Sequence, residues 1–207
     1  NGAGKSTLFK AVVGLVPLQS GEIRVFGQLH DDVRLVSYVP QRNEVDWDFP
    51  VTVRDVVMMG RFGELGWFRW PGRRDREIVE RCLEDVGMTD FADRQIGELS
   101  GGQQQRVFIA RALAQEARLI LMDEPFAGVD MNTERAIFAT LDALQERGIT
   151  VLLSTHNLNM AAAHFSRMAL LNRRLIAFGR PSEVLKPAIL PEAYGDQIAT
   201  WRTTEEG

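Results

Sequence analysis

Apolar residues at helical spacing mark several segments of the chain. Within residues 74–86 they recur at intervals of three and four, which predicts an amphipathic helix that ends at Gly87. A similar pattern follows Ser100, a natural N-cap, and continues through Ala114. Three more helices are predicted: residues 8–15, closed by Pro17; residues 133–147; and a short helix capped by Ser182 that runs through Leu185.

Short apolar or alternating runs between turn residues predict strands. These runs cover residues 22–26, 35–39, 119–124 and 150–154, and a final pair covers residues 168–171 and 175–178. The pattern weakens from Pro187 onward, and residues 203–207 are predicted to be mobile.

Residues 44–72 differ from the rest of the chain, because three of its four tryptophans lie there together with Phe49, Phe68, Met58 and Met59. One interpretation is the core of a small helical subdomain. The other is an aromatic and Met-rich surface that receives a partner. We expect both in part, since a few short helices could not bury this much apolar surface.

The first seven residues match the second half of a phosphate-binding loop, the Walker A motif: Asn1, Gly2, Ala3, Gly4, Lys5, Ser6 and Thr7. The glycine that opens the full motif would precede Asn1, so the sequence begins within the motif. Glycines let backbone N–H groups curl around phosphate oxygens, and a helix that starts near Lys5 adds its positive end. Lys5 would reach the terminal phosphates, and Ser6 would bind Mg²⁺. The half motif alone leaves open a simple Gly-rich turn before a helix.

Other parts of the sequence favour the phosphate-binding interpretation. Asp123 and Glu124 end an apolar strand in the Walker B arrangement, where Asp123 would hold Mg²⁺ and Glu124 would polarise the attacking water. Gln41, after a strand and Pro40, is a candidate Mg²⁺ and water ligand. His156 follows a buried strand and is a candidate γ-phosphate contact, whereas His30 and His164 receive no role. A second glycine-flanked helix start carries Ser100, Gly101, Gly102 and Gln103.

Composition excludes several classes of function. The 207 residues suit one large domain or two small ones, and the net charge of −4 offers no basic field for nucleic acid. No apolar run approaches the roughly 20 residues that span a bilayer. The single cysteine, Cys82, excludes an internal disulfide and is interpreted as a core residue. Three histidines and one cysteine, widely spaced, do not form a transition-metal site.

Six elements in this order make the chain resemble the nucleotide-binding subunit of an ATP-binding cassette (ABC) transporter. They are NGAGKST at 1–7, Gln41 after YVP, LSGGQQQR at 99–106, LILMDEP at 119–125, Asp130 in FAGVD and His156 in STHN. The resemblance covers essentially the whole chain. Within the family, residues 45–61 and 98–115 look like subunits that energise manganese, zinc or iron uptake, although substrate choice lies in other subunits.

The resemblance implies an α/β fold of the P-loop NTPase type, with a mixed sheet core, an antiparallel β layer and a helical subdomain. It implies one nucleotide-binding domain over residues 1–207. The helical subdomain would cover residues 44–117 and include the 99–106 segment. The rest of the ATPase core would cover residues 118–186, and a C-terminal tail residues 187–207.

The resemblance also implies a site that uses ATP and Mg²⁺. Residues 1–7 would bind the nucleotide, Ser6, Gln41 and Asp123 would hold Mg²⁺, and Glu124, His156 and Gln41 would be catalytic. Two copies would dimerise head to tail around two ATP molecules. Ser100, Gly101, Gly102 and Gln103 of one copy would then close on the γ-phosphate held by Lys5 of the other, with Asp130 at the same interface. Hydrolysis would release this link.

The implied partners are a second copy, integral membrane permease subunits and an extracytoplasmic metal-binding protein, but not nucleic acid. The implied location is the cytoplasmic face of the membrane, peripheral on the permease. One alternative is an ATPase for another small solute. A soluble cassette protein acting on ribosomes or DNA is disfavoured by the acidic balance and the single cassette. A non-hydrolysing regulatory module is disfavoured by the intact Lys5, Asp123, Glu124 and His156.

The sequence differs from the family pattern near its start and at Asn157. The aromatic residue that stacks on adenine and the strand before the loop are absent from the sequence given. We therefore expect residues 1–207 alone to bind ATP poorly or to fold marginally, and to hydrolyse ATP weakly or not at all. Asn157 follows His156 where many relatives have Asp, and we expect a small effect.

Overall fold

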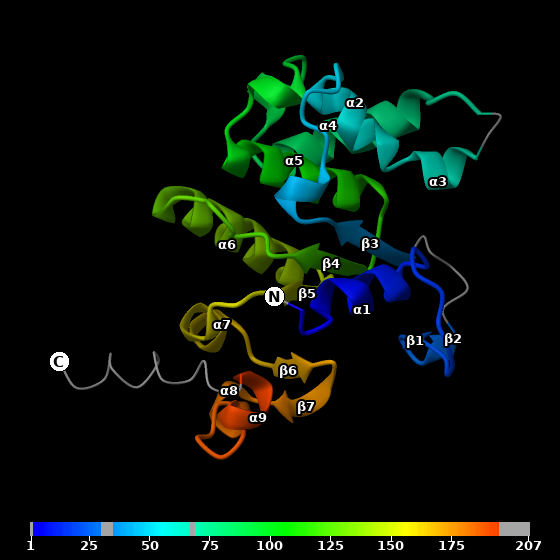
Figure 1. The fold of residues 1–207 in the computed structure, drawn as a ribbon. Helices are drawn as coiled ribbons and strands as arrows, with labels where there is room; N and C mark the ends of the chain where they lie inside the picture. The colour runs from blue at the N-terminus through cyan, green and yellow to red at the C-terminus, as the bar shows by residue number, and fades with distance from the viewer. Residues whose placement is uncertain (1, 30–34, 67–68, 195–207) are drawn as a thin grey trace. The chain divides into compact units, whose positions relative to one another are not determined.

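The computed structural model describes residues 2–29, 35–66 and 69–194 (Figure 1). The chain divides into two compact units, each described here by itself. One unit contains residues 9–154, and the other contains residues 2–8 together with those from 155 onward.

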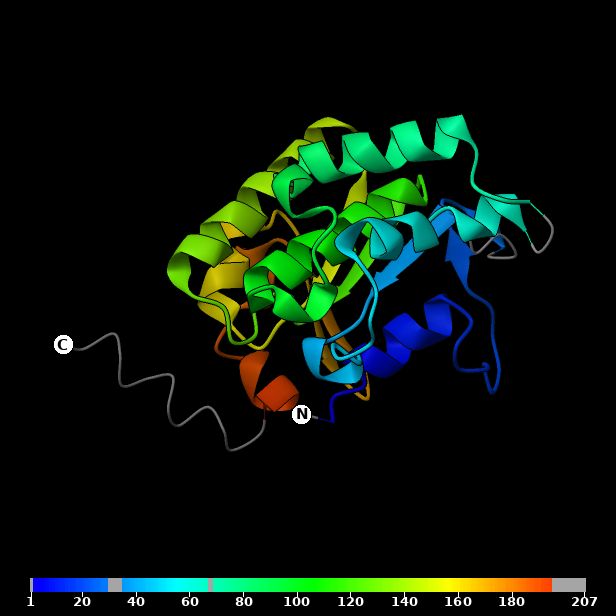
Figure 2. The ribbon, with the colours of Figure 1, turned by 90° about the horizontal axis from the view of Figure 1, so that it is seen from above.

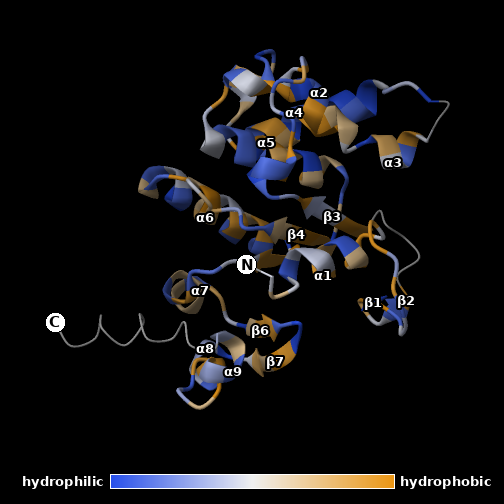
Figure 3. Cartoon of the chain, viewed as in Figure 1, coloured by the Kyte–Doolittle hydropathy of each residue, from blue (hydrophilic) through white to orange (hydrophobic). Residues whose placement is uncertain are grey.

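A parallel sheet lies at the centre of the larger unit. Its strands are β3 (Val36–Val39), β4 (Leu119–Asp123) and β5 (Thr150–Ser154), in the order β3-β4-β5. The sequence predicted all three strands, because each is a short apolar run without helical period. Ile120, Leu121 and Met122 of the middle strand are fully buried, and the hydrophobic colour follows the strands (Figure 3). Since the strands are parallel, their carboxyl ends meet at one edge.

Two long helices of this unit begin at side chains that cap them. Helix α5 (Gly101–Ala114) has Ser100 as its N-cap, as predicted, and Ser100 and Gln103 form a reciprocal capping box. Helix α6 (Met131–Glu146) is capped by Asp130 and begins two residues earlier than predicted. An Asp at this position accepts the first free N–H groups of a helix, which explains the earlier start.

The described residues between 44 and 117 form helices and no strand. Besides α5, they are α2 (Val53–Met59), α3 (Phe62–Leu65), α4 (Arg73–Asp85) and the 3₁₀ turns η3 (Thr89–Phe91) and η4 (Ile96–Glu98). Helices α2, α4 and α5 lie side by side (Figure 2). A Cβ atom on Gly60, at the end of α2, would lie 2.3 Å from the Arg111 carbonyl oxygen. This close approach to α5 requires glycine at position 60.

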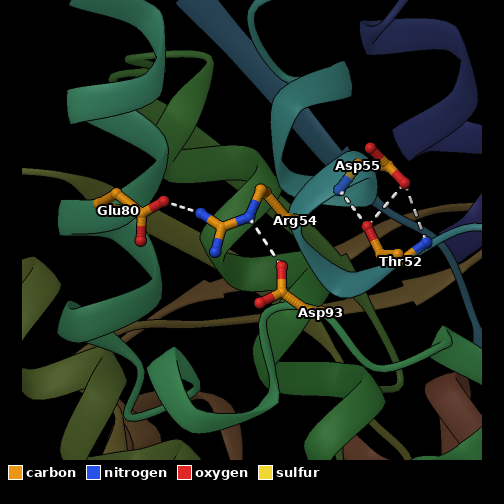
Figure 4. A network of polar contacts seen from close by, with 5 residues as sticks. All are labelled: Thr52, Arg54, Asp55, Glu80 and Asp93. Atoms are coloured by element: carbon orange, nitrogen blue, oxygen red, sulfur yellow. Dashed lines mark hydrogen bonds and ion pairs between the residues drawn. The ribbon is translucent and has the colours of Figure 1, made fainter.

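Ion pairs join these helices. Arg54 of α2 pairs with Glu80 of α4, and its Nε donates to Asp93 at 3.2 Å (Figure 4). At the start of α2, Thr52 and Asp55 form a second capping box.

A more buried ion pair forms at the other end of α2. Arg61 donates from Nε to Asp75 at 3.1 Å, and from Nη1 to Glu116 and to the Ala114 carbonyl, each at 2.7 Å. The side chains of Arg61 and Asp75 are only 6% and 12% exposed. A hydrogen bond from the Gly72 N–H lowers the pKa of Asp75, burial opposes this, and Arg61 lowers the pKa further.

Replacement of Asp75 by Ala is expected to lower the free energy of unfolding by about 3 kcal/mol, because a buried cation loses its nearest anion. Arg61 keeps Glu116 and the Ala114 carbonyl as acceptors, so we expect the lower end of the usual range. Urea unfolding of the full-length protein measures the change. Arg73→Gln, which breaks an exposed pair with Glu77, is the control and should change stability little. A loss no larger than the control's would contradict the role of Asp75.

The sign of the pH dependence follows from the lowered pKa of Asp75. Its stabilising contribution is present above the unfolded value, about 4, and is lost as the pH falls through the folded value.

The segment from residue 5 to residue 29 departs from the predicted boundaries. Helix α1 (Lys5–Val12) ends three residues before the predicted end at residue 15, because Gly14 adopts a left-handed conformation, with φ 75°. The predicted strand over residues 22–26 is shortened to β1 (Arg24–Val25), which pairs with β2 (Gln28–Leu29). Phe26 and Gly27 form the two-residue turn between them, both with positive φ.

The smaller unit contains the hairpin that the sequence predicted, as β6 (Met168–Asn172) and β7 (Arg174–Gly179). Helices α7 (Leu158–His164), α8 (Pro181–Val184) and α9 (Leu190–Tyr194) cover its apolar residues, which include Met168, Leu170 and Val184. Ser182 was wrongly predicted as a cap, because it lies inside α8, whose N-cap is Arg180. Helices α7 and α9 were not predicted. The predicted mobile segment, residues 203–207, lies outside the described residues.

Candidate functional site

Asp123 lies at the carboxyl end of the middle strand and is 2% exposed. Its Oδ1 accepts a hydrogen bond from the Ser154 hydroxyl on the neighbouring strand. Its Oδ2 is buried and has no hydrogen-bond partner among the described residues. A buried carboxylate oxygen without a partner is costly unless a cation or water satisfies it. The residue therefore fits a site for a hard cation such as Mg²⁺.

Tyr38 shares this face of the sheet. It lies opposite Leu121 on the neighbouring strand, two residues before Asp123. Its hydroxyl oxygen is buried near the Asp123 carboxylate, without a hydrogen bond of normal geometry to any described residue. Burial raises the pKa of Tyr38, and the negative charges of Asp123 and Glu44 raise it further, so the phenol stays neutral. The sequence analysis did not identify Tyr38; the signal was its position two residues before Pro40, at the strand end that leads to Gln41.

Glu124 follows Asp123 in an uncommon backbone conformation, with φ 47°. Its N–H donates to both the carbonyl oxygen and the hydroxyl oxygen of Ser154, at 3.2 Å and 3.1 Å. The neighbouring strand therefore fixes the main chain of Glu124 where the chain leaves the sheet. Residues held in such conformations are frequent at functional sites.

Gln41 lies at the same edge, after the adjacent strand β3. It is half-buried and is the N-cap residue of the 3₁₀ turn η2 (Arg42–Glu44), and its carbonyl oxygen accepts from the Glu44 N–H at 2.9 Å. The structure thus brings Gln41, Asp123 and Glu124 to one edge of one parallel sheet.

The two glycines at the start of α5 face different neighbours. A Cβ atom on Gly101 would lie 3.0 Å from Arg42 Nη1, and one on Gly102 would lie 2.0 Å from Thr133 Cγ2. Thr133 is fixed in turn, because its hydroxyl donates to Asp130 at 2.8 Å. A side chain at either glycine would therefore displace a neighbouring residue.

Asp130 accepts the N–H groups of Asn132 and Thr133 at 2.9 and 3.0 Å, as the cap of α6. These hydrogen bonds, first that from the Thr133 N–H, lower the pKa of Asp130.

The glycine-rich start of the chain belongs to the smaller unit. Gly2 and Gly4 have φ values of 99° and 89°, and no atom lies within 4 Å of where their Cβ atoms would be. Helix α1 then begins at Lys5, and the Leu8 N–H donates to the Gly4 carbonyl at 2.9 Å. The loop therefore has the open, left-handed glycine geometry that phosphate binding needs. Asn1 lies outside the described residues.

His156 also belongs to the smaller unit, in the bend between β5 and α7, and it is exposed. The next residue, Asn157, caps α7 by accepting the Met160 N–H at 3.0 Å. Asn and Asp cap helices about equally well, which supports the expectation that Asn in place of Asp has a small effect here.

Within the described ranges, no group of three or more His, Cys, Asp or Glu side chains could hold a metal ion. In the same ranges, every helix is too short or too polar to cross a bilayer.

A family model, two protein sequences and one solved structure that are similar to this chain all come from transport systems. A family model described as ABC transporter matches residues 1–127. The chain is 54% identical over 201 residues to the zinc transport system ATP-binding protein TroB of Treponema pallidum, covering 97% of this chain and 76% of that protein. It is 51% identical over 199 residues to the manganese transport system ATP-binding protein MntB of Bacillus subtilis, covering 96% and 80%. The fold is similar to an ATP-binding cassette of an ABC transporter in its ADP conformation, with a TM-score of 0.80, 26% identity and coverage of 95% and 85%.

Proposed function

Because this chain belongs to the ATP-binding subunits of ABC transporters, we propose that it hydrolyses ATP to drive uptake of manganese or zinc through a membrane permease. The observation that carries the proposal is identity of about half of all residues, over nearly the whole chain, to ATP-binding proteins of zinc and manganese transport systems. The mixed α/β fold with its parallel core sheet is that of the family.

ATP would bind through residues 1–7. The open glycine geometry at Gly2 and Gly4 and the start of α1 at Lys5 support this assignment. Ser6, Gln41 and Asp123 would hold Mg²⁺, and the unpartnered Oδ2 of Asp123 is the observation in favour of it. When bound, Mg²⁺ would supply positive charge for the β- and γ-phosphate oxygens.

Glu124 would accept a proton from the attacking water. Its main chain is fixed by Ser154, so a carboxylate is held beside the strand end that carries Asp123. His156 would contact the γ-phosphate. The Ser154 hydroxyl, which donates to Asp123, would keep that carboxylate oriented.

Two copies would form the complete site. The N–H groups of Gly101 and Gly102 lie in the first turn of α5 and have no intrahelical acceptor. We propose that the start of α5 contacts the ATP that is bound to the second copy, through Ser100, Gly101, Gly102 and Gln103. Asp130 would lie at the same interface. The absence of side chains at positions 101 and 102 lets Arg42 and Thr133 pack against the helix start.

The permease would dock on the apolar part of residues 44–72. Trp47 packs edge-on against Phe108, and Val53, Val56 and Val57 are buried, so part of this segment is core. Phe49, Phe62 and Trp70 remain 57%, 54% and 91% exposed. A hollow of about 370 Å³ is lined by Leu15, Tyr38, Met59, Gly63, Glu64, Gln115 and others. Exposed aromatic side chains and a largely apolar hollow suit a helix of a partner protein.

This subunit would lie at the cytoplasmic face of the membrane, peripheral on the permease. An extracytoplasmic metal-binding protein would deliver the ion. ATP hydrolysis and transport by the full complex in liposomes, measured ion by ion, test the function. We expect Mn²⁺ or Zn²⁺ to stimulate hydrolysis and to accumulate inside. Hydrolysis that responds to another solute and to neither ion would contradict the proposed substrate.

His156→Ala is expected to lower the turnover of the reconstituted complex about a hundredfold or more, because a preorganised contact to the transferring phosphate is lost. His164→Ala is the matched control, since His164 lies at the end of α7 and has no assigned role. ATPase assays at saturating ATP measure both. A near-normal rate for His156→Ala would argue against its contact with the γ-phosphate.

A further inference from the structure

We infer that Arg42 and Glu44 are positioning residues, which tie the turn after Gln41 to the helix of the phosphate loop and to the helix of the 99–106 segment. The inference rests on the proposed function, and it adds two residues to which neither the sequence motifs nor the comparisons assign a role. All the contacts that carry it lie within residues 9–154.

The first link joins the turn η2 to helix α5. Arg42 Nε donates to Gln104 Oε1 at 3.1 Å, and the Gln104 amide donates to the Ile96 carbonyl at 3.2 Å. Gln104 is 2% exposed, so its amide has one fixed arrangement. The Arg42 guanidinium also lies against Gly101, where a Cβ atom would come within 3.0 Å of Nη1. The guanidinium therefore contacts the first turn of α5.

A second contact secures the same turn farther along α5. Trp47 Nε1 donates to the Arg42 carbonyl oxygen at 2.8 Å, and the Trp47 ring meets Phe108 with 5.2 Å between ring centroids. A Cβ atom on Gly97 would lie 2.6 Å from the Trp47 carbonyl oxygen. The segment from Arg42 to Trp47 is thus packed along α5 over two of its turns.

The third link joins the turn to helix α1. Lys10 Nζ and Glu44 Oε1 are 2.8 Å apart, and their side chains are 30% and 38% exposed. Lys10 belongs to the same continuous helix that begins at Lys5. One short turn directly after Gln41 therefore contacts α1 through Glu44 and α5 through Arg42.

If the ion pair between Lys10 and Glu44 served only to stabilise the fold, its loss would lower stability and leave the turnover of the folded protein unchanged. An ion pair exposed to this degree contributes little to folding stability, because water screens it and two long side chains lose freedom. Its placement matters more, since small displacements at a site that transfers a phosphoryl group lower the rate steeply. Loss of either link should therefore lower turnover more than it lowers ATP binding or stability.

A charge swap tests the link to α1 in the full-length protein, assembled with its permease. Glu44→Lys and Lys10→Glu should each lower kcat about tenfold, with KM for ATP within about twofold and an unchanged melting temperature. The double variant, Lys10→Glu with Glu44→Lys, should recover to within about twofold of the unmodified complex. Failure of the swap to restore turnover would overturn this link.

Removal of the guanidinium tests the link to α5. Arg42→Met keeps the apolar stem and should also lower kcat about tenfold, with KM nearly unchanged. Arg54→Met is the matched control, because Arg54 is an arginine of the helical region whose ion-pair partners, Glu80 and Asp93, lie outside this turn (Figure 4). It should leave kcat within about twofold.

The outcomes separate this inference from the proposed function. If the unmodified complex does not hydrolyse ATP, the proposed function fails and the inference fails with it. If the unmodified complex is active and Arg42→Met and Glu44→Lys match it, only the inference fails. If Arg42→Met lowers kcat no more than Arg54→Met does, the role of Arg42 is structural. The role is also structural if the loss of kcat is accompanied by a lower melting temperature that accounts for it.

Discussion

Glu124→Gln is expected to lower ATP hydrolysis by the assembled transporter about a hundred- to ten-thousandfold and to leave ATP binding intact. The reason is that glutamine keeps the size of the side chain and one acceptor oxygen but has no carboxylate that could accept a proton from water. The backbone hydrogen bonds that fix residue 124 to Ser154 involve only its N–H, so the substitution leaves them in place.

The measurement pairs phosphate release with nucleotide binding by calorimetry. Glu146→Gln, at the exposed end of α6, is the control for loss of one carboxylate and should retain full activity. Because ATP stays bound, the Glu124→Gln variant should also accumulate a dimer of two copies upon addition of ATP. Unchanged hydrolysis in Glu124→Gln would remove this residue from the role of base.

Gly102→Ala is expected to prevent that ATP-dependent dimer and to lower turnover about a hundredfold. The new methyl group would lie 2.0 Å from Thr133 Cγ2, and Thr133 cannot rotate away without losing the hydrogen bond from its hydroxyl to Asp130. The clash must shift the start of α5 or the start of α6, and both are proposed to lie at the interface between copies.

Sedimentation of Gly102→Ala in the Glu124→Gln background measures the dimer directly. Thr133→Ala should partly restore it, since only the Thr133 Cβ atom, 3.0 Å away, would remain close. Gly101→Ala should be milder, because its neighbour is the flexible end of Arg42. A dimer that forms normally in Gly102→Ala would show that this helix start does not take part.

Elements with a strong local signal could be predicted from the sequence. Helix α5 was predicted to its last residue, because Ser100 is a cap and the apolar period is regular. The strands β4 and β5 could be predicted because each is a short apolar run without the helical period. The end of α1 was misplaced, since apolar spacing continues to Leu15 while the backbone at Gly14 has already left the helix.

Only those residues of the candidate site that belong to a sequence motif or lie at the end of a predicted strand could be predicted. Gln41 follows one predicted strand, and Asp123 and Glu124 end another, so a place at a strand end could be predicted for each of them. The contacts of Arg42 with Gln104 and of Gly102 with Thr133 could not, because each joins residues distant in sequence whose types are common on helix surfaces. Tyr38 was overlooked, since a tyrosine within an apolar strand is indistinguishable from ordinary core.

The neutral phenol of Tyr38 has a consequence for spectroscopy. The chain contains two tyrosines, and burial raises the pKa of both Tyr38 and Tyr194. In the unfolded chain each would ionise near pH 10, whereas the native fold moves the ionisation of both to higher pH. Folding therefore loses stability as the pH rises above about 10. The ultraviolet absorbance of tyrosinate from Tyr38 should therefore appear as the native state melts in alkali, which makes it a built-in optical reporter of unfolding that needs no added dye.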